Sequence, residues 1–546
     1  MNSVLQPHRP ETSPAGSAYP LPFLPATALA ALCGLFYFLA FPGIDLWPLA
    51  FVTWIPLLVA LQGQTPTRAA WLGWVAGFTM TMTGFYWLLE MLRAFSGFGT
   101  TLCFVFMAIV CAYQAGRIAL MAWLYVRAAQ RGWPMALAFT LAFTTSELVF
   151  PLLFPWTFAA TVHQLPILLQ TAELGGQILV AAALVLANLA LAEPVLARFE
   201  RRSIRWRSSA ALAMGLLVTI AYGVVRLPQV DATMAEAPKV RVGVVQANMS
   251  LLGKRQHKHE GLRRHLALTR ELQQEAPLDL VVWAETSVVG ATNEATIADD
   301  YPRLFTRRLG VPVIFGGVLI RPVDDVRDYV LFNSALATDV AGRITGRYDK
   351  QYLLAFGEYL PLGDVFPILY EWSPNSGRFT PGSSFDSLPV GGRKVGVLIC
   401  YEDIIPHFVN RIVRQDEPQL LVNMTNDAWF GDSTEPWIHW ALAKFRTIEQ
   451  RRYLARANNS GVSGFIDAAG RVISNTETFE QAALAADLAW LTSTTPFRVL
   501  GNTPWWVCAL MSLWMSVRGR RQVTRPVTPD GARAQGSTGE SSSDGE

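Results

Sequence analysis

Residues 394–403 read Lys-Val-Gly-Val-Leu-Ile-Cys-Tyr-Glu-Asp, an apolar run that is followed at once by a cysteine, a tyrosine and two acids. A short apolar run with β-branched residues, bounded by polar residues, is typical of a buried β-strand. The pattern predicts a strand over residues 394–399, with Cys400 just past its end. Because open α/β sheets bind ligands beyond the carboxyl ends of their strands, Cys400 is a candidate functional residue.

Similar runs surround this stretch and alternate with helical segments between residues 239 and 490. Strands are predicted at residues 239–247, 278–284, 311–319, 330–338, 394–399 and 420–424, with a hairpin at 464–467 and 471–474. Helices are predicted at residues 257–275 and 437–457. Strands that alternate with helices favour a layered α/β fold in which the helices cover the sheets.

Two charged residues occupy positions like that of Cys400. Glu285 follows the run Leu-Val-Val-Trp-Ala, and Lys350 follows the strand-like run Ile-Thr-Gly-Arg-Tyr-Asp. A carboxylate can take the proton of a thiol, and a nearby cation favours the thiolate and stabilises an oxyanion. Taken singly, these residues fit an inert thiol, a helix-capping acid and a solvated turn. The combination favours nucleophilic catalysis.

The distribution of the cysteines supports this interpretation. Cys33, Cys103, Cys111 and Cys508 lie inside apolar runs, where a free thiol behaves as a small hydrophobic group. Cys400 is the single cysteine of the polar region, which excludes a disulfide within that region. A lone thiol in a polar region is a candidate reactive group.

The chain as a whole is poor in charge. Of its 546 residues, 51% are hydrophobic and 16% are charged, whereas about 25% of the residues of an average soluble domain are charged. A membrane-crossing helix needs about 20 mostly apolar residues. Eight spans are predicted, at residues 21–41, 46–61, 69–89, 100–125, 134–153, 168–191, 210–225 and 505–517. The net charge of +3 is too small to bear on nucleic-acid binding. The polar region has no basic patch interleaved with aromatic residues, so no nucleic-acid partner is expected.

Arginines are concentrated in every second joint between these spans. They include Arg68, Arg127 and Arg131, and the groups at residues 198–207 and 518–525. Since cytoplasmic loops are enriched in Lys and Arg, both termini are expected in the cytoplasm. The predicted organisation is a cytoplasmic tail at 1–20, seven membrane helices at 21–226, an extracytoplasmic domain at 227–500, an eighth helix at 501–517 and a disordered cytoplasmic tail at 518–546.

Short motifs around the three candidate residues match those of a known family. The motifs are Trp283-Ala-Glu285-Thr, Tyr348-Asp-Lys350-Gln-Tyr-Leu, Phe356-Gly-Glu358-Tyr-Leu-Pro361, Cys400-Tyr-Glu402 and Asn426-Asp-Ala-Trp-Phe-Gly431. They resemble the nitrilase superfamily and, more narrowly, the apolipoprotein N-acyltransferase family. Gly84-Phe-Tyr-Trp87 and Phe154-Pro-Trp156 are similar to the membrane half of that family. The resemblance implies a multi-span α-helical membrane bundle and an extracytoplasmic α/β domain with a nitrilase-like αββα sandwich.

The resemblance also implies roles for single residues. Glu285 would be the general base, Cys400 the nucleophile, and Lys350 the cation that orients the reacting groups and stabilises the transition state. The supporting or substrate-binding positions that match the family are Glu358, Tyr401, Glu402 and Trp429. No cofactor and no metal are implied, because a thioester keeps an acyl group activated.

The implied reaction occurs in the bacterial inner membrane, with the catalytic domain in the periplasm. Cys400 would accept an acyl chain from a phospholipid, with phosphatidylethanolamine the expected donor. The thioester would then acylate the N-terminal amine of a diacylated apolipoprotein. A membrane-bound amidase or nitrilase-type hydrolase is the alternative, although a tether needs only one span. A transporter or a lipoprotein receptor would leave the triad unexplained.

Three further features are open at this point. The family often has a tryptophan in the loop after the first strand, but residues 251–259 contain none, which leaves the gating of the substrate entrance open. Residues 356–372 are aromatic, apolar and broken by Gly and Pro, and fit either the membrane interface or core packing. Glu147 and Glu173 lie within predicted spans, where an acid is either functional or a partner in helix packing.

Overall fold

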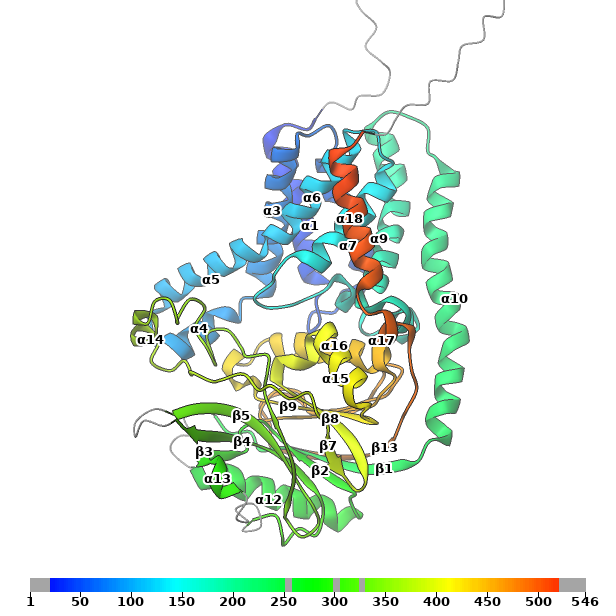
Figure 1. The fold of residues 1–546 in the computed structure, drawn as a ribbon. Helices are drawn as coiled ribbons and strands as arrows, with labels where there is room; N and C mark the ends of the chain where they lie inside the picture. The colour runs from blue at the N-terminus through cyan, green and yellow to red at the C-terminus, as the bar shows by residue number, and fades with distance from the viewer. Residues whose placement is uncertain (1–19, 251–257, 298–304, 324–328, 520–546) are drawn as a thin grey trace, which may run out of the picture.

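The computed structural model describes residues 20–250, 258–297, 305–323 and 329–519. The predicted tails at 1–20 and 518–546 lie almost wholly outside the described residues, as does most of the segment 251–259 that lacks a tryptophan. The described chain forms a helical bundle and an α/β domain, which lie one above the other in Figure 1.

The helical bundle contains helices of very different lengths. They are α1 (Phe23–Leu39), α2 (Ile55–Ala60), α3 (Pro66–Gly84), α4 (Leu88–Ser96), α5 (Thr100–Gln114), α6 (Gly116–Ala129), α7 (Met135–Val149), α8 (Pro166–Leu169), α9 (Ala172–Phe199), α10 (Trp206–Glu236) and α18 (Thr503–Val517), with the 3-10 turns η1 (Trp47–Phe51) and η2 (Phe158–Val162). In the described part of the chain, three helical stretches are long and apolar enough to cross a membrane: Thr100–Ala129, Ala172–Phe199 and Trp206–Glu236. The count of eight spans stays a prediction.

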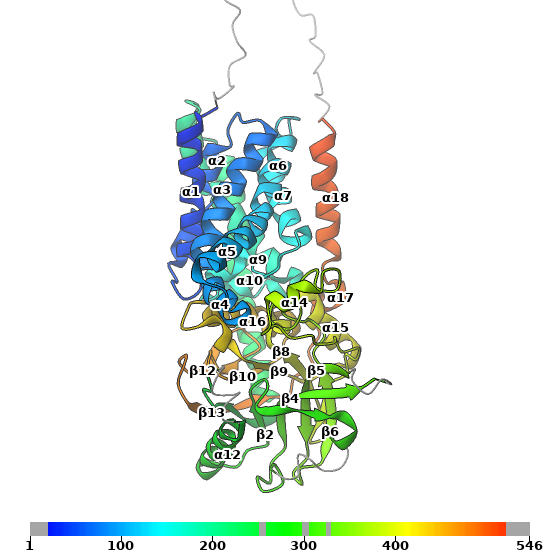
Figure 2. The same ribbon diagram turned by 90° about the vertical axis from the view of Figure 1, so that its left-hand side faces the viewer.

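Several of the predicted spans are interrupted. The span predicted at residues 46–61 consists of η1 and the short helix α2, and the span predicted at 69–89 is divided between α3 and α4. The span predicted at residues 100–125 divides at Ala115 into α5, which leans away from the bundle, and α6, which stands upright (Figures 1 and 2). Helix α9 is kinked at Gly175 and Gly176, and the φ of Gly176 is +70°, which favours glycine. A Cβ atom on Gly176 would lie 2.6 Å from the Phe497 ring, so the kink also allows α17 (Pro496–Leu500) to approach α9.

One end of the bundle contacts the α/β domain and the other end is remote from it. The start of α1 and the end of α18 both lie at the remote end (Figure 1). There Arg68 Nη2 donates to Leu21 O at 3.0 Å, and Arg131 Nε donates to Val517 O at 3.1 Å. The arginine-bearing joints therefore lie at the same end of the bundle as the start of α1 and the end of α18.

The α/β domain contains two β-sheets. In the described residues the strand order is β13-β1-β2-β4-β5-β6 in one sheet, with β3 paired to β4, and β12-β11-β10-β9-β8-β7 in the other. The strands are β1 (Lys239–Gln246), β2 (Leu280–Trp283), β3 (Val288–Asn293), β4 (Val313–Pro322), β5 (Tyr329–Thr338), β6 (Ile344–Asp349), β7 (Leu388–Val390), β8 (Arg393–Ile399), β9 (Leu420–Thr425), β10 (Leu454–Asn458), β11 (Gly464–Ile466), β12 (Val472–Asn475) and β13 (Ala482–Ala489). Strands β8, β9 and β10 are parallel neighbours, and β9 and β10 are buried throughout, as expected for parallel strands covered on both faces.

Helices cover the outer faces of both sheets. Helix α12 (Lys258–Glu275) covers the first sheet, while α15 (Pro406–Asp416) and α16 (Glu435–Gln450) lie between the second sheet and the bundle (Figure 1). The short helices are α13 (Glu294–Ile297) and α14 (Ile368–Trp372), and the 3-10 turns are η4 (Cys400–Ile404) and η5 (Asp427–Phe430). The order helix, sheet, sheet, helix confirms the predicted nitrilase-like α/β fold.

Six strands predicted from the sequence occur within a few residues of their predicted bounds, as β1, β2, β4, β5, β8 and β9, and the predicted hairpin is β11–β12. The helix predicted at residues 437–457 is wrong at its C-terminal end. Helix α16 ends at Gln450 because Arg451 adopts a left-handed conformation (φ +49°), and its buried guanidinium donates to Ala468 O at 2.7 Å. The chain then turns into β10, which pairs with β9.

Candidate active site

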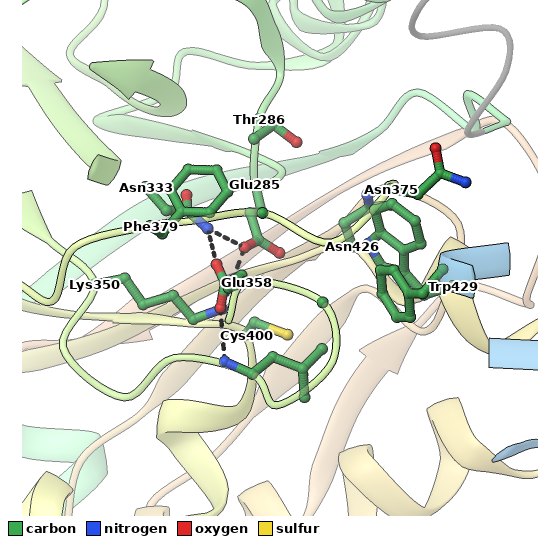
Figure 3. Close-up of a pocket in the computed structure, with 14 residues that line it drawn as sticks. Glu285, Thr286, Asn333, Lys350, Glu358, Asn375, Phe379, Cys400, Asn426 and Trp429 are labelled. Atoms are coloured by element: carbon green, nitrogen blue, oxygen red, sulfur yellow. Dashed lines mark hydrogen bonds and ion pairs between the residues drawn. The ribbon is translucent and has the colours of Figure 1, made fainter. Parts of the chain in front are cut away.

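The three residues that were predicted to act together line one cavity of about 200 Å³ (Figure 3). Glu285 follows β2, Lys350 follows β6 and Cys400 follows β8. Glu358, Asn333 and Trp429 line the same cavity. The two sheets therefore deliver a carboxylate, a cation and a thiol to one place from three strand ends.

Lys350 is buried and held between two carboxylates. Its Nζ atom lies 2.7 Å from Glu358 Oε2 and 3.5 Å from Glu285 Oε1. Asn333 bridges the same acids, since its Nδ2 donates to Glu285 Oε1 at 2.6 Å and to Glu358 Oε1 at 2.7 Å (Figure 3). The Leu354 N–H donates to Glu358 Oε2 at 2.8 Å. These contacts fix the cation and both acids, as charge-assisted hydrogen bonds do.

Burial and charge act against each other on the thiol and on the lysine. Burial raises the pKa of the Cys400 thiol, Lys350 lowers it and Glu285 raises it, and the resulting pKa lies well above the usual value. Burial lowers the pKa of Lys350, but Glu358 and Glu285 raise it, so that Lys350 stays charged. Cys400 is thus a protonated thiol at neutral pH and needs a base in the cavity to become a nucleophile.

The backbone at Cys400 is strained, and Glu402 holds it. Cys400 has a φ of +54°, which is costly for a residue other than glycine. The Glu402 carboxylate accepts hydrogen bonds from the Ile399 N–H at 2.8 Å, the Gln351 N–H at 2.7 Å and the Tyr348 hydroxyl at 2.9 Å. Burial raises the pKa of Glu402 to about 7 while these backbone donors oppose the rise. Glu402 therefore joins the cysteine turn to the segment after β6.

Tyr401 and Glu402 are not among the residues that line the cavity, although the resemblance groups them with supporting or substrate-binding positions. The Tyr401 ring stacks on His439 with 4.8 Å between centroids, and its hydroxyl donates to Glu435 Oε1. Both residues contact protein groups behind the nucleophile. The contacts of Tyr401 and Glu402 thus hold the turn at Cys400 in position.

A buried cluster of charges surrounds Tyr401. His439 Nε2 lies 2.8 Å from Asp403 Oδ1, and His439 Nδ1 lies 3.3 Å from Asp427 Oδ1. Arg456 contacts the same two acids, at 3.1 Å and 3.4 Å. The donor atoms of Asp427, Glu435 and His439 lie within 4.8 Å of one another, close enough to hold a cation. Within the described residues, Asp427 already pairs with two of the protein's own cations, His439 and Arg456.

Trp429 forms the contact between the cavity and the helical bundle. Its ring stacks on Phe95 of α4, with ring centroids 4.4 Å apart, and both side chains line the cavity. Part of the wall beside Cys400 is therefore supplied by the bundle. Phe95 was not predicted from the sequence, because no motif or periodicity marks a residue whose partner lies in another half of the chain. Asn333 was not predicted either, because it is an ordinary strand residue in the sequence.

The two acids within predicted spans have structural partners. Glu147 Oε1 lies 3.1 Å from Arg117 Nη1. Glu173 pairs with Arg226 at 2.6 Å and with Arg451 at 2.7 Å, and so joins α9 to α10 and to the end of α16. These ion pairs neutralise both acids and favour helix packing as their role.

Comparison with known proteins identifies both halves. Residues 33–190 match the model of the apolipoprotein N-acyltransferase N-terminal domain, and residues 241–493 match that of carbon-nitrogen hydrolases. Apolipoprotein N-acyltransferase of Pseudomonas putida is 30% identical over 511 residues, covering 91% of this chain and 98% of that protein. The Geobacter metallireducens protein of the same name is 28% identical, covering 88% and 92%.

Among solved structures, Saccharomyces cerevisiae Nit3, a member of branch 10 of the nitrilase superfamily, is 17% identical with a TM-score of 0.35, covering 46% of this chain and 90% of that chain. The relatives match the chain across both of its halves, the bundle and the α/β domain alike. The chain belongs to the apolipoprotein N-acyltransferase family.

Proposed function

We propose that this protein transfers a fatty acyl chain from a membrane phospholipid, through a thioester on Cys400, to the N-terminal amine of the diacylglyceryl-cysteine of apolipoproteins. The observation that carries the proposal is the shared cavity wall, in which Glu285, Lys350 and Cys400 of the α/β domain lie with Phe95 of the bundle. Exposing hydrocarbon to water costs about 0.8 kcal/mol per CH₂. A thiol at the junction with the bundle is suited to two lipid-anchored substrates.

In the first step Glu285 takes the thiol proton of Cys400 while the sulfur attacks the ester carbonyl carbon of the phospholipid. Lys350 carries three N–H donors, two of which have Glu358 and Glu285 as partners, and the third is available for the oxyanion. When the ester C–O bond breaks, Glu285 returns the proton to the leaving oxygen. The products are the acyl-thioester and a lysophospholipid, and phosphatidylethanolamine is the expected donor.

In the second step the α-amine of the apolipoprotein attacks the thioester carbonyl. Glu285 accepts a proton from the amine as the new C–N bond forms, and the C–S bond breaks. The proton passes to the Cys400 sulfur, which restores the thiol. The acyl group remains activated between the two steps, so this scheme uses no cofactor.

The placement in the membrane is part of the proposal. Eight spans in the inner membrane would leave both termini in the cytoplasm and the α/β domain in the periplasm. The gathering of Arg68, Arg127 and Arg131 at the bundle end remote from the α/β domain supports this orientation, because cytoplasmic ends are rich in arginine. The three long apolar helices support a membrane location.

The segment 356–372 is proposed to touch the membrane surface near the cavity. Several of its apolar side chains are exposed, among them Leu362 (66%), Val365 (65%) and Trp372 (53%), which favours the interface over core packing for that part of the segment. Helix α14 within the segment lies near α4 and α5 (Figures 1 and 2). The following residue, Ser373, donates to Phe95 O at 3.4 Å and so ties the segment to the bundle.

A transfer assay separates this function from the hydrolase alternative. The purified protein in phosphatidylethanolamine vesicles is given a synthetic diacylated lipopeptide, and the lipopeptide is weighed by mass spectrometry. We expect a gain of one acyl chain with the wild type and with the control Cys508→Ser, and none with Cys400→Ser. Release of free fatty acid without a change in the lipopeptide would establish a hydrolase instead.

A further inference from the structure

Two adjoining cavities lie between α15, the α17–α18 corner and the bundle, and they share no lining residue with the catalytic cavity. The outer cavity has a volume of about 400 Å³ and the inner one about 260 Å³. Both are lined by His407, Phe497 and Asn502, so they lie next to each other. Neither cavity has a role in the acyl-transfer scheme.

The outer cavity carries positive charge. His407, Arg411 and Arg414 are spaced at i, i+4 and i+7 along α15 and therefore share one face of that helix. The Arg411 guanidinium lies over the Phe385 ring, 3.9 Å from its centre. A guanidinium in this position can still donate hydrogen bonds to a ligand through its N–H groups. Within the described ranges, no ion pair is found for Arg411 or Arg414.

The acids next to this face already have cationic partners. Asp416 pairs with Lys394, and Glu417 pairs with Arg498. The two arginines of the outer cavity are therefore not neutralised by their neighbours. A ligand that carries negative charge fits this cavity.

The inner cavity belongs to the junction with the bundle, and its lining is mixed, with the polar Glu147, Gln177 and His407 beside apolar side chains. Its apolar lining includes Leu148, Phe150, Leu152, Ile178, Ile404 and Leu442. On the outer rim Leu500 is 50% exposed, and Trp506 in the first turn of α18 is 53% exposed. Exposed Trp at the start of an apolar helix is typical of the membrane interface. With the proposed membrane placement, the arginines would lie at the depth of lipid phosphates.

We propose that the two cavities together bind an anionic phospholipid of the bilayer, with its phosphate on Arg411 and Arg414 and part of a hydrocarbon chain in the inner cavity. Basic pockets beside membrane helices recognise anionic headgroups in this way. Helix α15 follows the η4 turn that carries Cys400 almost directly, so the bound lipid seats the catalytic turn on the membrane. The site is distinct from the acyl-donor site, and it rests on the proposed membrane placement rather than on acyl transfer.

The test measures binding without turnover. Diether phosphatidylglycerol has no ester acyl chain to donate, and its retention by the purified full-length protein is titrated by native mass spectrometry. The variant Arg411→Gln/Arg414→Gln is compared with Arg307→Gln/Arg308→Gln, which removes two exposed arginines just before β4, in the sheet farther from the bundle. We expect the first pair to weaken retention by roughly tenfold or more and the control pair to leave it unchanged.

A second variant, Leu500→Glu, places an acid on the rim without removing an arginine, and we expect it to weaken retention as well. Equal retention by the wild type and by both cavity variants would overturn the proposal. Displacement of the lipid by excess inorganic phosphate as readily as by a second anionic lipid would also overturn it, because the site would then be one for a free anion. A failure of acyl transfer leaves this binding readout unaffected.

Discussion

The ring of Phe95 in α4 stacks on the ring of Trp429 in η5, with 4.4 Å between their centroids and 21° between their planes. This contact joins the helical bundle to the α/β domain at the cavity that contains Cys400. The pair forms an apolar wall of that cavity, which under the proposed function would border the path of a lipid chain to the thiol.

The wall predicts a selective defect. Phe95→Ala and Trp429→Ala should lower phospholipid-dependent acylation by roughly tenfold, because an aromatic pair contributes about 1 kcal/mol beyond its buried area and also shapes the entrance. Alkylation of Cys400 by a small soluble reagent should change little. The exposed Phe104→Ala on α5 is the matched control. An equal loss of phospholipid-dependent acylation and of Cys400 alkylation would show that the pair only stabilises the fold.

The electrostatics of Cys400 predict opposite effects of one substitution. Glu285 raises the pKa of the thiol, so Glu285→Gln should lower that pKa and shift the pH profile of iodoacetamide alkylation toward lower pH. The same variant should lose about 10²–10⁴-fold in acyl transfer, because the general base is gone. We therefore expect Cys400 of Glu285→Gln to be alkylated faster than in the wild type, while acyl transfer is slower. A profile that moves to higher pH would contradict the assigned geometry.

Glu402 is predicted to hold the strained turn at Cys400. In Glu402→Gln an amide donor replaces one of two carboxylate oxygens, both of which accept from N–H or O–H groups. A buried donor facing another donor should cost ~2–4 kcal/mol of stability and lower the thermal midpoint by several degrees. Differential scanning fluorimetry checks this against the exposed Glu371→Gln. An unchanged midpoint would mean that the turn is held by other contacts.

The buried cluster behind the nucleophile predicts that stability falls with pH. Burial and Asp427 raise the pKa of Glu435 to about 8, and despite burial and Arg456, the acids Asp403 and Asp427 raise that of His439 to about 9. Both groups hold a proton more tightly when folded. Their contribution is therefore complete below the unfolded pKa values and is lost as pH rises through about 8 and 9.

Thermal midpoints measured between about pH 5 and 9 should decrease accordingly. Glu435→Gln imitates the neutral acid, so we expect a midpoint near that of the wild type at about pH 5 and a weaker decrease toward pH 9. Glu435→Ala leaves the Tyr401 hydroxyl without its acceptor and should lower the midpoint at every pH. A midpoint for Glu435→Gln as low as that for Glu435→Ala would show that Glu435 is ionised.

Much of the α/β fold was predictable because its central strands are short apolar runs that end in polar residues. The strand before Cys400 and the strand before Glu285 are of this kind, and the structure has them as β8 and β2. Helix α16 was harder, since its polar residues Lys444 and Arg446 contact the bundle residues His163 and Gln177 instead of water. A sequence window cannot distinguish a polar interface with another part of the chain from a solvated face.

The reactive residues of the site were predictable from the sequence, whereas a residue that holds them in place was not. Motifs at strand ends predicted that Glu285, Lys350 and Cys400 act together, and all three line the cavity. Asn333, which bridges the two acids, is an ordinary strand residue in the sequence. Its role depends on the antiparallel register of β5 and β6, which no local pattern encodes.

The central claim is that Cys400 carries the acyl group between two lipid substrates. The most direct measurement is the intact mass of the purified protein after incubation with phosphatidylethanolamine alone, followed by peptide mapping. We predict a gain of one fatty acyl chain on the peptide that contains Cys400, absent in Cys400→Ala and present in Cys508→Ser, and discharged by a diacylated lipopeptide. Folded protein that gains no acyl chain, or gains it on another residue, would contradict the account.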